Sequence, residues 1–268
     1  VQILSSNLVQ NPSFSEQGAE EVSNGSFSQE GVEQVTSFTN GTTYPFSTFT
    51  SLDNNITSAI INSNFAGCVS NSISVTSSQI YKVSFNYTKN SGDDLRVVFS
   101  SVVSGAGAQT SNAELVSTSG SITLYLTISS SGTSYLQLGT ASGSASIDFS
   151  ISNFSVREVG QDWTLGTGWS IAEDKAISDG VSGASPIYQN IGSATIGKTY
   201  KIQLDVSNYT SGTLVAAYGG TSAVGITSNG SYTFYVKATS TDANTSYLSY
   251  NFNGSITNIS VKEVGQNW

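Results

Sequence analysis

The sequence predicts an all-β protein in which two antiparallel β-sandwich domains follow an N-terminal lead-in segment. Apolar and polar residues alternate along most of the chain, and the spacing typical of helices is nearly absent. Clusters of Gly, Ser, Asn and Asp separate the alternating runs, as expected for the turns of antiparallel sheets. Residues 153–163 recur without gaps as residues 258–268, which indicates two copies of one structural unit.

The repeat predicts three segments along the chain of 268 residues. We expect a lead-in at residues 1–35, a first sandwich at residues 36–160 and a second sandwich at residues 161–268. Each sandwich is long enough to bury a core of its own.

The lead-in contains a shorter duplication, because NPSFSEQGAEEV is followed thirteen residues later by NGSFSQEGVEQV. The corresponding positions are Asn11/Asn24, Phe14/Phe27, Gly18/Gly31, Glu20/Glu33 and Val22/Val35. We expect this segment to form a small hairpin or a paired strand ahead of the first sandwich.

Matching strands are predicted in the two sandwiches, because the same alternation occurs in the same order. The runs IYKVSFNYT and SITLYLTIS of the first sandwich correspond to TYKIQLDVSNYT and SYTFYVKAT of the second. One side of each strand is apolar and is expected to face the core. The residues expected to face inward are Tyr81, Val83, Phe85, Tyr87, Ile122, Leu124, Leu126, Ile128, Tyr200, Ile202, Leu204, Val206, Tyr232, Phe234 and Val236.

The closing strand of each repeat carries one extra residue. The apolar positions of ASIDFSISNFSVREV run two apart and then jump by three, from Ile151 to Phe154, and SITNISVKEV makes the same jump. An inserted residue in one strand of an antiparallel pair forms a β-bulge. We therefore predict bulges near Ser152/Asn153 and Thr257/Asn258.

The composition excludes several classes of function. Charged residues make up 10% of the chain and the net charge is -9, which does not suit a protein that neutralises a nucleic-acid backbone. No apolar run reaches the ~20 residues that a membrane-spanning helix requires. The single cysteine, Cys68, lies among small and apolar residues, so we expect a buried small hydrophobe rather than a disulfide framework.

We expect no enzymatic activity and no cofactor. The chain contains no histidine, which removes His-dependent catalytic triads, the usual general base near neutral pH and the commonest zinc ligand. The acidic residues concentrate in the lead-in and in turns, where solvation explains them. The sequence therefore does not indicate the pair of carboxylates that hydrolyses glycosides.

Tyrosines on the outward side of predicted strands are the better candidates for a functional surface. Tyr125 and Tyr235 point opposite to the apolar residues of matching strands, and Tyr135 and Tyr247 match in the next strand. Flat aromatic faces stack on sugar rings while nearby amides and hydroxyls fix the orientation of the sugar. Tyrosine is also favoured where subunits or domains meet, so glycan binding and packing against a neighbour both stay open.

Trp163 and Trp169 flank the joint between the repeats. We favour a role as core or interdomain anchors, and a role as ligand platforms is the alternative. The first repeat has no Trp at the matching place, where Tyr44 and Phe46 are candidates to replace it.

The final phrase VKEVGQNW matches an interior phrase that runs on into TLGTGWSI, so we expect the chain to be part of something longer or to have lost a third module. We expect Trp268 to pack back on its own module.

Three pieces of the chain resemble the repeat modules of structural proteins of tailed bacteriophages, especially marine ones: NLVQNPSFSEQGAEEVSNGSF, QDWTLGTGWSIAEDKA and GSITNISVKEVG. Those modules are similar to the jelly-roll carbohydrate-binding modules appended to glycoside hydrolases. The resemblance covers most of the chain. It implies jelly-roll sandwiches, a location on the virion surface, and partners that are other virion subunits, with homo-oligomers that are often trimers.

The resemblance also implies a structural calcium, which carbohydrate-binding members often hold between the opening segment and an acidic closing strand. In the first repeat it points to Glu16 or Glu30 together with Asp148. The second repeat departs from the pattern, with Thr257 and Asn258 near the matching place. This departure weakens the case for calcium, which prefers carboxylate and carbonyl oxygens.

Two functions are consistent with these observations. The first is a non-catalytic structural virion protein of a bacteriophage, of tail-fibre, head-fibre or decoration type, which acts by assembly and surface display. The second is a carbohydrate-binding module or adhesin that recognises polysaccharide on a host surface. Glycan binding that is lost when Tyr125 or Tyr235 is replaced would favour the second.

Overall fold

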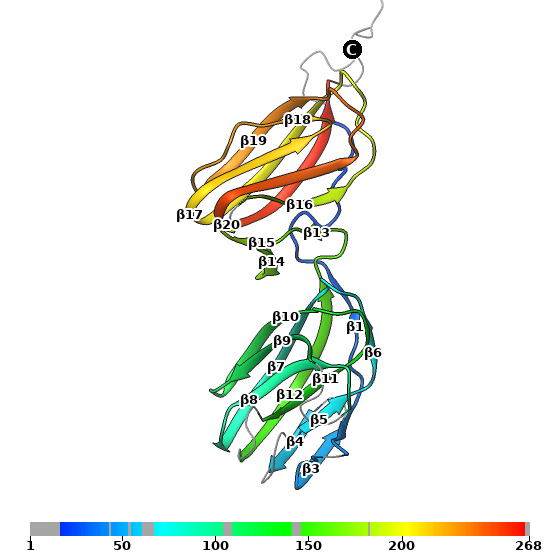
Figure 1. The fold of residues 1–268 in the computed structure, drawn as a ribbon, viewed down its shortest axis with the longest axis vertical. Coiled ribbons are helices and arrows are strands. Elements are labelled where there is room, and N and C mark those ends of the chain that lie inside the picture. The colour runs from blue at the N-terminus through cyan, green and yellow to red at the C-terminus, as the bar shows by residue number, and fades with distance from the viewer. Residues whose placement is uncertain are drawn as a thin grey trace, which may run out of the picture. The chain divides into compact units, whose positions relative to one another are not determined.

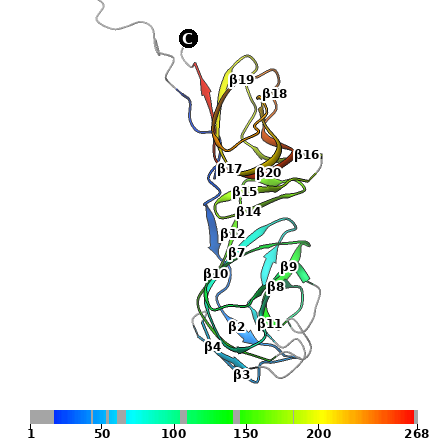
Figure 2. The ribbon, with the colours of Figure 1, turned by 90° about the vertical axis from the view of Figure 1, so that its left-hand side faces the viewer.

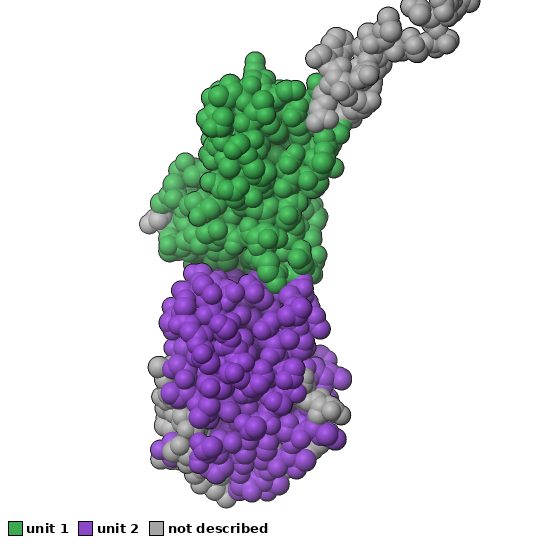
Figure 3. Space-filling model, turned by 90° about the vertical axis from the view of Figure 1, so that its right-hand side faces the viewer, with its two compact units in different colours: residues 1–29, 160–268 green, residues 30–159 purple. Residues whose placement is uncertain are grey.

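The protein consists of two all-β units, each a sandwich of antiparallel strands (Figure 1). The computed structural model describes residues 17–42, 44–52, 55–60, 67–103, 109–140, 146–181 and 183–265. Within these ranges, only the backbone is described at residues 57–60. We call the unit of residues 30–159 module 1, and the unit of residues 1–29 and 160–268 module 2 (Figure 3). The described residues form no helix, and therefore none that could cross a membrane.

Module 1 has two sheets, which Figure 2 shows on opposite sides of the module. One sheet has the order β10-β7-β12-β4-β3, with β1 paired to β12, and the other has the order β2-β5-β11-β8-β9, with β6 paired to β11. The strands are β1 (Glu30–Glu33), β2 (Phe38–Asn40), β3 (Thr48–Leu52), β4 (Asn55–Ile60), β5 (Gly67–Ser70), β6 (Ile73–Val75), β7 (Ile80–Gly92), β8 (Leu95–Ser100), β9 (Gln109–Val116), β10 (Gly120–Thr127), β11 (Gly132–Thr140) and β12 (Ile147–Val159).

Module 2 repeats this strand order. Two of its strands, β17 and β20, are long, and each belongs to both layers of the sandwich. Residues 199–207 of β17 pair with residues 255–264 of β20, and residues 213–217 pair with residues 246–250. The first zone carries β15 and β19 at its sides, and the second carries β16 and β18. The strands are β13 (Thr164–Leu165), β14 (Trp169–Ala172), β15 (Lys175–Asp179), β16 (Ala184–Asn190), β17 (Thr199–Tyr218), β18 (Thr221–Ser222), β19 (Gly230–Lys237) and β20 (Asn244–Val264).

A glycine permits the bend of β17 between its two zones. Gly212 has a φ of 79°, and a Cβ atom at this position would clash with the carbonyl oxygen of Asn251 on β20. Only glycine combines this backbone conformation with so close an approach. The register shifts between Ser207 and Thr213 mark the same place.

The lead-in is not a separate segment, because the structure divides it between the two modules. Its second copy forms β1, in which Glu30 pairs with Val159 at the end of β12. The described part of its first copy, from Gln17 onward, lies on β20 in the same way, and Gln17 pairs with Val264. Residues 30–35 therefore complete module 1, and residues 17–22 complete module 2, to which residues 24–29 of the second copy also belong. The chain of module 1 is inserted into the chain of module 2.

The lengths of the neighbouring strands explain where the copies dock. Strand β4 pairs with residues 148–151 of β12, and β15 pairs with residues 253–256 of β20. The last residues of both closing strands extend past these partners and would leave unpaired backbone groups at the edge. The lead-in copies satisfy these groups, for example through the hydrogen bonds Gln34 N–H to Val156 O (2.9 Å) and Glu21 N–H to Val261 O (3.0 Å).

The cores follow the predicted alternation. Tyr81, Val83, Phe85 and Tyr87 of β7 are all buried, and so are their counterparts on the first half of β17. Some inward residues of β10 and β19, nearer the sheet edge, are half-buried: Ile122, Leu124, Tyr232 and Phe234. Cys68 is fully buried as expected, and this burial raises the pKa of its thiol.

Both predicted β-bulges are present. The β7–β12 register shifts between Ser152 and Ser155, and the β17–β20 register shifts at the equivalent place. Asn153 and Asn258 adopt left-handed conformations there, with φ of 54° and 53°. Asparagine tolerates this conformation better than most residues, which explains why the SNF and TNI phrases keep it.

Replacing Asn153 tests this account. Asn153→Ala should destabilise module 1 by about 1 kcal/mol because alanine resists a positive φ, whereas Asn153→Gly should be neutral or slightly stabilising. Denaturant unfolding followed by circular dichroism measures the change. Ser152→Ala, one residue earlier and without a positive φ, is the control. Equal effects of the alanine and glycine variants would contradict the conformational explanation.

Candidate functional site

The solvent-facing side of one sheet carries the same row of side chains in each module. Residues that pair directly in an antiparallel ladder place their side chains on the same side of the sheet. The module 1 row on β10, β7 and β12 is Tyr125, Lys82 and Arg157, and the module 2 row on β19, β17 and β20 is Tyr235, Lys201 and Lys262. Each row thus sets an aromatic ring beside two cations.

The tyrosines of the two rows differ in exposure. Tyr235 is 65% exposed, whereas Tyr125 is half-buried. A ring with one free face can stack on a flat ligand. Tyr235 is therefore the stronger candidate of the two.

Tyr135 and Tyr247 do not occupy matching places, contrary to the expectation that they match on corresponding strands. Tyr135 is half-buried, but Tyr247 is fully buried and lies 6.0 Å from the ring of Trp163. The inward side of β20 at this point carries Thr245, Tyr247 and Ser249, so Tyr247 occupies the core side of its strand. Burial raises the pKa of its hydroxyl, and Tyr247 cannot contact a glycan.

Trp163 and Trp169 are core anchors of module 2 and not ligand platforms. Both are more than nine-tenths buried. The Trp163 indole donates a hydrogen bond to the Asn24 carbonyl (3.1 Å), and the Trp169 indole donates one to the Ser185 carbonyl (3.0 Å). A buried indole N–H normally requires such a partner. Trp268 lies outside the described residues.

In module 1 only one of the two proposed replacements for Trp is in the core. Phe46 is buried and packs edge-on against Phe149, with ring centroids 5.7 Å apart. Tyr44 is exposed. Phe46 therefore belongs to the core of module 1, and residues 30–159 include no tryptophan.

The row side of the module 2 sheet contains two open hollows. One, of about 400 Å³, is lined by Gln17, Thr199, Tyr235, Val264 and Gly265. The other, of about 300 Å³, lies over the bulge and is lined by Gln203, Leu204, Asp205, Ser231, Tyr232, Thr233, Asn258 and Ser260. Hydroxyl, amide and carboxylate groups of this kind hydrogen-bond to the hydroxyls of a sugar.

Module 1 has a hollow of about 420 Å³ beside its own bulge. Its polar lining consists of Asn55, Asn86, Thr88, Ser150 and Ser152. Asn86 takes the place that Asp205 has in module 2, because both pair with the residue before a bulge asparagine. Both modules thus have a polar hollow at the bulge, but the hollow of module 1 has a neutral lining and lies toward β4, whereas the hollow of module 2 lies toward β19.

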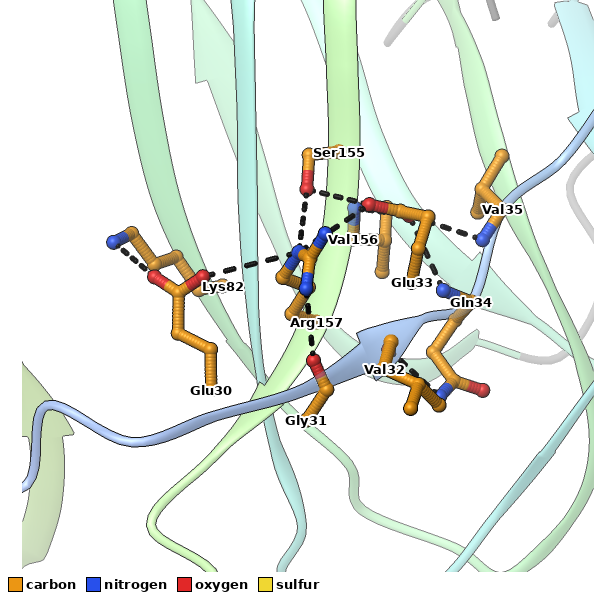
Figure 4. A network of polar contacts seen from close by, with 10 residues as sticks. All are labelled: Glu30, Gly31, Val32, Glu33, Gln34, Val35, Lys82, Ser155, Val156 and Arg157. Carbon is orange, nitrogen blue, oxygen red and sulfur yellow. Dashed lines mark hydrogen bonds and ion pairs between the residues drawn. The ribbon is translucent and has the colours of Figure 1, made fainter.

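A carboxylate ties each lead-in copy to its closing strand. In module 1, Glu33 accepts hydrogen bonds from the Val156 N–H (2.7 Å), the Ser155 hydroxyl (2.6 Å) and the Val35 N–H (3.2 Å), as Figure 4 shows. It also lies 3.6 Å from Arg157 Nε. One side chain therefore satisfies backbone donors on both segments just after the bulge.

Glu20 does the same in module 2. It accepts hydrogen bonds from the Val261 N–H (2.8 Å), the Ser260 hydroxyl (2.6 Å) and the Val22 N–H (3.1 Å), and lies 3.8 Å from Lys262 Nζ. These contacts match those of Glu33 residue for residue.

The predicted calcium ligands are not brought together. Glu30 lies at the Val159 end of β12 and forms an ion pair with Lys82 (2.6 Å), whereas Asp148 lies eleven residues before Val159 and accepts a hydrogen bond from Asn90. At about 3.3 Å per residue, a strand places these carboxylates about 35 Å apart. Glu16 lies outside the described residues, and the described part of the chain has no cluster of three metal-binding side chains.

The surroundings of Glu158 shift the pKa of its carboxyl group. Burial raises the pKa of Glu158, and a hydrogen bond from the Gln79 amide (3.1 Å) partly offsets this effect. Burial also raises the pKa of nearby Tyr81 to about 12, with a smaller contribution from the charge of Glu158. Glu158 is thus held by Gln79 beside a core tyrosine and is not among the residues that line the module 1 hollow.

The cations of the rows and the role of the two lead-in carboxylates were not predicted from the sequence. Glu20 and Glu33 were visible as equivalent positions of the lead-in duplication, and Arg157 and Lys262 as equivalent positions of the closing strands. The sequence does not show that each lead-in copy docks on a different closing strand. Residues more than a hundred positions apart therefore could not be recognised as neighbours.

Comparisons with known proteins found likenesses among solved structures only. No protein-family model matches the sequence, and no curated protein matches it. The arabinose-bound α-L-arabinofuranosidase MgGH51 is 18% identical and covers 53% of this chain, with a TM-score of 0.31. The tandem CBM22-1–CBM22-2 domain of Xyn10C from Paenibacillus barcinonensis is 12% identical over 91% of this chain and 100% of its own, with a TM-score of 0.27.

A xanthan lyase from Paenibacillus is 14% identical over 87% of this chain, with a TM-score of 0.26. The chain spans only about a quarter of the length of the arabinofuranosidase and of the lyase, 27% and 26%. These neighbours are thus a tandem of carbohydrate-binding modules and two carbohydrate-active enzymes. At TM-scores below 0.5 the likenesses do not establish a shared function.

Proposed function

We propose that this chain is a non-catalytic protein that binds glycans through the row side of its module 2 sheet. The observation that carries the proposal is the exposed ring of Tyr235 beside an open hollow on an otherwise polar sheet face. An aromatic face with convergent hydroxyl and amide groups is the usual chemistry of sugar recognition.

The geometry suits an extended saccharide better than a small compact ligand. The two hollows of module 2 lie on the same three strands, one at the Tyr235 end and the other at the bulge. A chain of sugars can stack on Tyr235 and run along the strands toward Asp205 and Asn258. The Asn258 amide donates a hydrogen bond to the Asp205 carboxylate (2.7 Å), which fixes both groups for contacts with sugar hydroxyls.

The second candidate is a structural virion protein of a bacteriophage that acts by assembly and display on the particle surface. The bacteriophage-like sequence phrases favour it, together with the completion of two successive sandwiches by two copies of one lead-in motif. This candidate makes other virion subunits the partners, including further copies of the chain. The two functions coincide if the displayed modules bind a glycan of the host surface.

Replacing Tyr235 tests the glycan proposal. Tyr235→Ala should weaken binding to any polysaccharide retained by the full chain by about tenfold, because a stacking contact of about 1.4 kcal/mol is lost. Affinity electrophoresis against a panel of polysaccharides, followed by titration calorimetry, provides the measurement. Tyr250→Ala is the matched control, since Tyr250 is also exposed (47%) but lies in the other layer.

Two results would count against the proposal. The first is an absence of retention on every polysaccharide, and the second is equal binding by the Tyr235 and Tyr250 variants. Incubation of the full chain with each retained polysaccharide should release no reducing ends, and their release would show an enzyme instead.

A further inference from the structure

The two lead-in copies differ at the position that faces the row. Glu30 of the second copy pairs with Val159, and Gln17 of the first copy pairs with Val264 at the equivalent place. The chain therefore has a carboxylate at this position in module 1 and a neutral amide in module 2. Beside the row cations, this difference leaves module 2 with one carboxylate fewer than module 1.

In module 1 the cations of the row are neutralised within the module. Glu30 lies 2.6 Å from Lys82 Nζ and 3.8 Å from Arg157 Nε, and Glu33 lies 3.6 Å from the same nitrogen (Figure 4). The Arg157 guanidinium also donates hydrogen bonds to Ser155 and to the Gly31 carbonyl. Two carboxylates thus balance two cations, and little positive charge is left for a ligand.

In module 2 the same positions hold one carboxylate for two cations. Glu20 lies 3.8 Å from Lys262 Nζ, and Gln17 carries no charge. Within the described ranges, no carboxylate lies at ion-pair distance from Lys201. Lys201 is the direct cross-strand neighbour of Tyr235, so the unbalanced cation lies beside the exposed ring.

We infer that the module 2 row selects anionic saccharides, with the acid group of the sugar on Lys201 and Lys262 and the ring on Tyr235. This inference rests on the glycan-binding function proposed above. The hollow lined by Gln17, Thr199 and Tyr235 lies one step along the strands from the two lysines, because Thr199 precedes Lys201 by two residues on the same face. The amide of Gln17 can donate a hydrogen bond to an anion, whereas the carboxylate of Glu30 at the equivalent position of module 1 would repel it.

The ligand chemistry is that of a carboxylate-bearing or sulfate-bearing polysaccharide, and matched polymers distinguish the two. Dextran sulfate is compared with dextran, and polygalacturonate with its methyl ester, so that each pair shares one sugar backbone and one member of it lacks the negative charge. The full chain should bind at least one anionic polymer about tenfold more tightly than its neutral partner. The pair that shows the difference identifies the acid group.

Reciprocal substitutions at the lead-in position provide the sharpest test. Gln17→Glu should give module 2 the charge balance that module 1 already has and remove the preference for the anionic polymer. Lys201→Gln should weaken anionic binding about tenfold and leave neutral binding unchanged. Glu30→Gln should free a cation in module 1 and increase the number of bound anionic ligands per chain.

Lys175→Gln controls for net charge, because Lys175 lies on β15, away from the row. Equal binding of charged and neutral polymers would overturn the inference, and so would equal effects of Lys201→Gln and Lys175→Gln. If Tyr235→Ala still weakens binding about tenfold in that case, the glycan proposal stands and only the charge selectivity fails. If Tyr235→Ala has no effect either, both fail.

Discussion

Replacing Trp163 with alanine is expected to destabilise module 2 by about 3–5 kcal/mol, the usual cost of removing a buried tryptophan. The indole is 8% exposed and lies between Phe27 (5.1 Å between ring centroids) and Tyr247 (6.0 Å). It joins three parts of the chain: the lead-in, the start of the second repeat and β20. Alanine would leave a cavity at their junction and leave the Asn24 carbonyl without its indole donor.

Tryptophan fluorescence can follow this effect in module 2 alone. The chain has three tryptophans, all in the module 2 unit, so residues 30–159 do not contribute to the signal. In the variant, the buried Trp169 still reports unfolding of the module. We expect the denaturant midpoint of this signal to fall sharply, and hydrogen exchange to increase in residues 17–29 before it increases elsewhere.

Two comparisons make the Trp163 prediction specific. Trp163→Phe should recover most of the stability, because a ring still fills the space between Phe27 and Tyr247 while the indole hydrogen bond is lost. Tyr235→Ala, which removes an exposed ring from the same module, should change the midpoint little. A loss below about 1 kcal/mol in Trp163→Ala would show that Trp163 does not anchor the lead-in.

The predictable features of the fold are those that depend on the alternation of apolar and polar residues or on a single inserted residue. The inward residues of β7 and the bulges at Asn153 and Asn258 could be read directly, because a period of two and a jump of three are local patterns. The orientation of Tyr247 could not, because a slip of one residue reverses the face of a strand. The sequence match paired Tyr247 with Tyr135, and the inward neighbours of Tyr247 are polar, so the alternation gave no sign of its place in the core.

The candidate site was only partly predictable for a different reason. Tyr235 was visible as an outward aromatic residue, but Gln17 and Lys201 belong to one surface only because the first lead-in copy skips a whole module to reach β20. Local sequence carries no information about such an insertion. The duplication contained the relevant difference between Gln17 and Glu30, and the structure was needed to show that both positions face equivalent rows.

Replacing Glu33 with alanine is expected to destabilise module 1 by about 2–3 kcal/mol, because several hydrogen-bond donors lose a charged acceptor at once. The carboxylate is 26% exposed and serves Val156, Ser155 and Val35. Water can reach part of this site and replace some contacts, which keeps the loss below that of a buried charge pair. Strand β1 should therefore detach from the end of β12.

The equivalence of Glu33 and Glu20 provides the control for this prediction. Glu33→Ala should leave the tryptophan transition of module 2 unchanged while hydrogen exchange rises in residues 30–35 and 155–159. Glu20→Ala should do the reverse, lowering the tryptophan midpoint and raising exchange in residues 17–22 and 260–264, since its contacts with Val261 and Ser260 match those of Glu33. If either variant destabilised both modules equally, the lead-in copies would not belong to separate modules, and the inserted arrangement of the chain would be wrong.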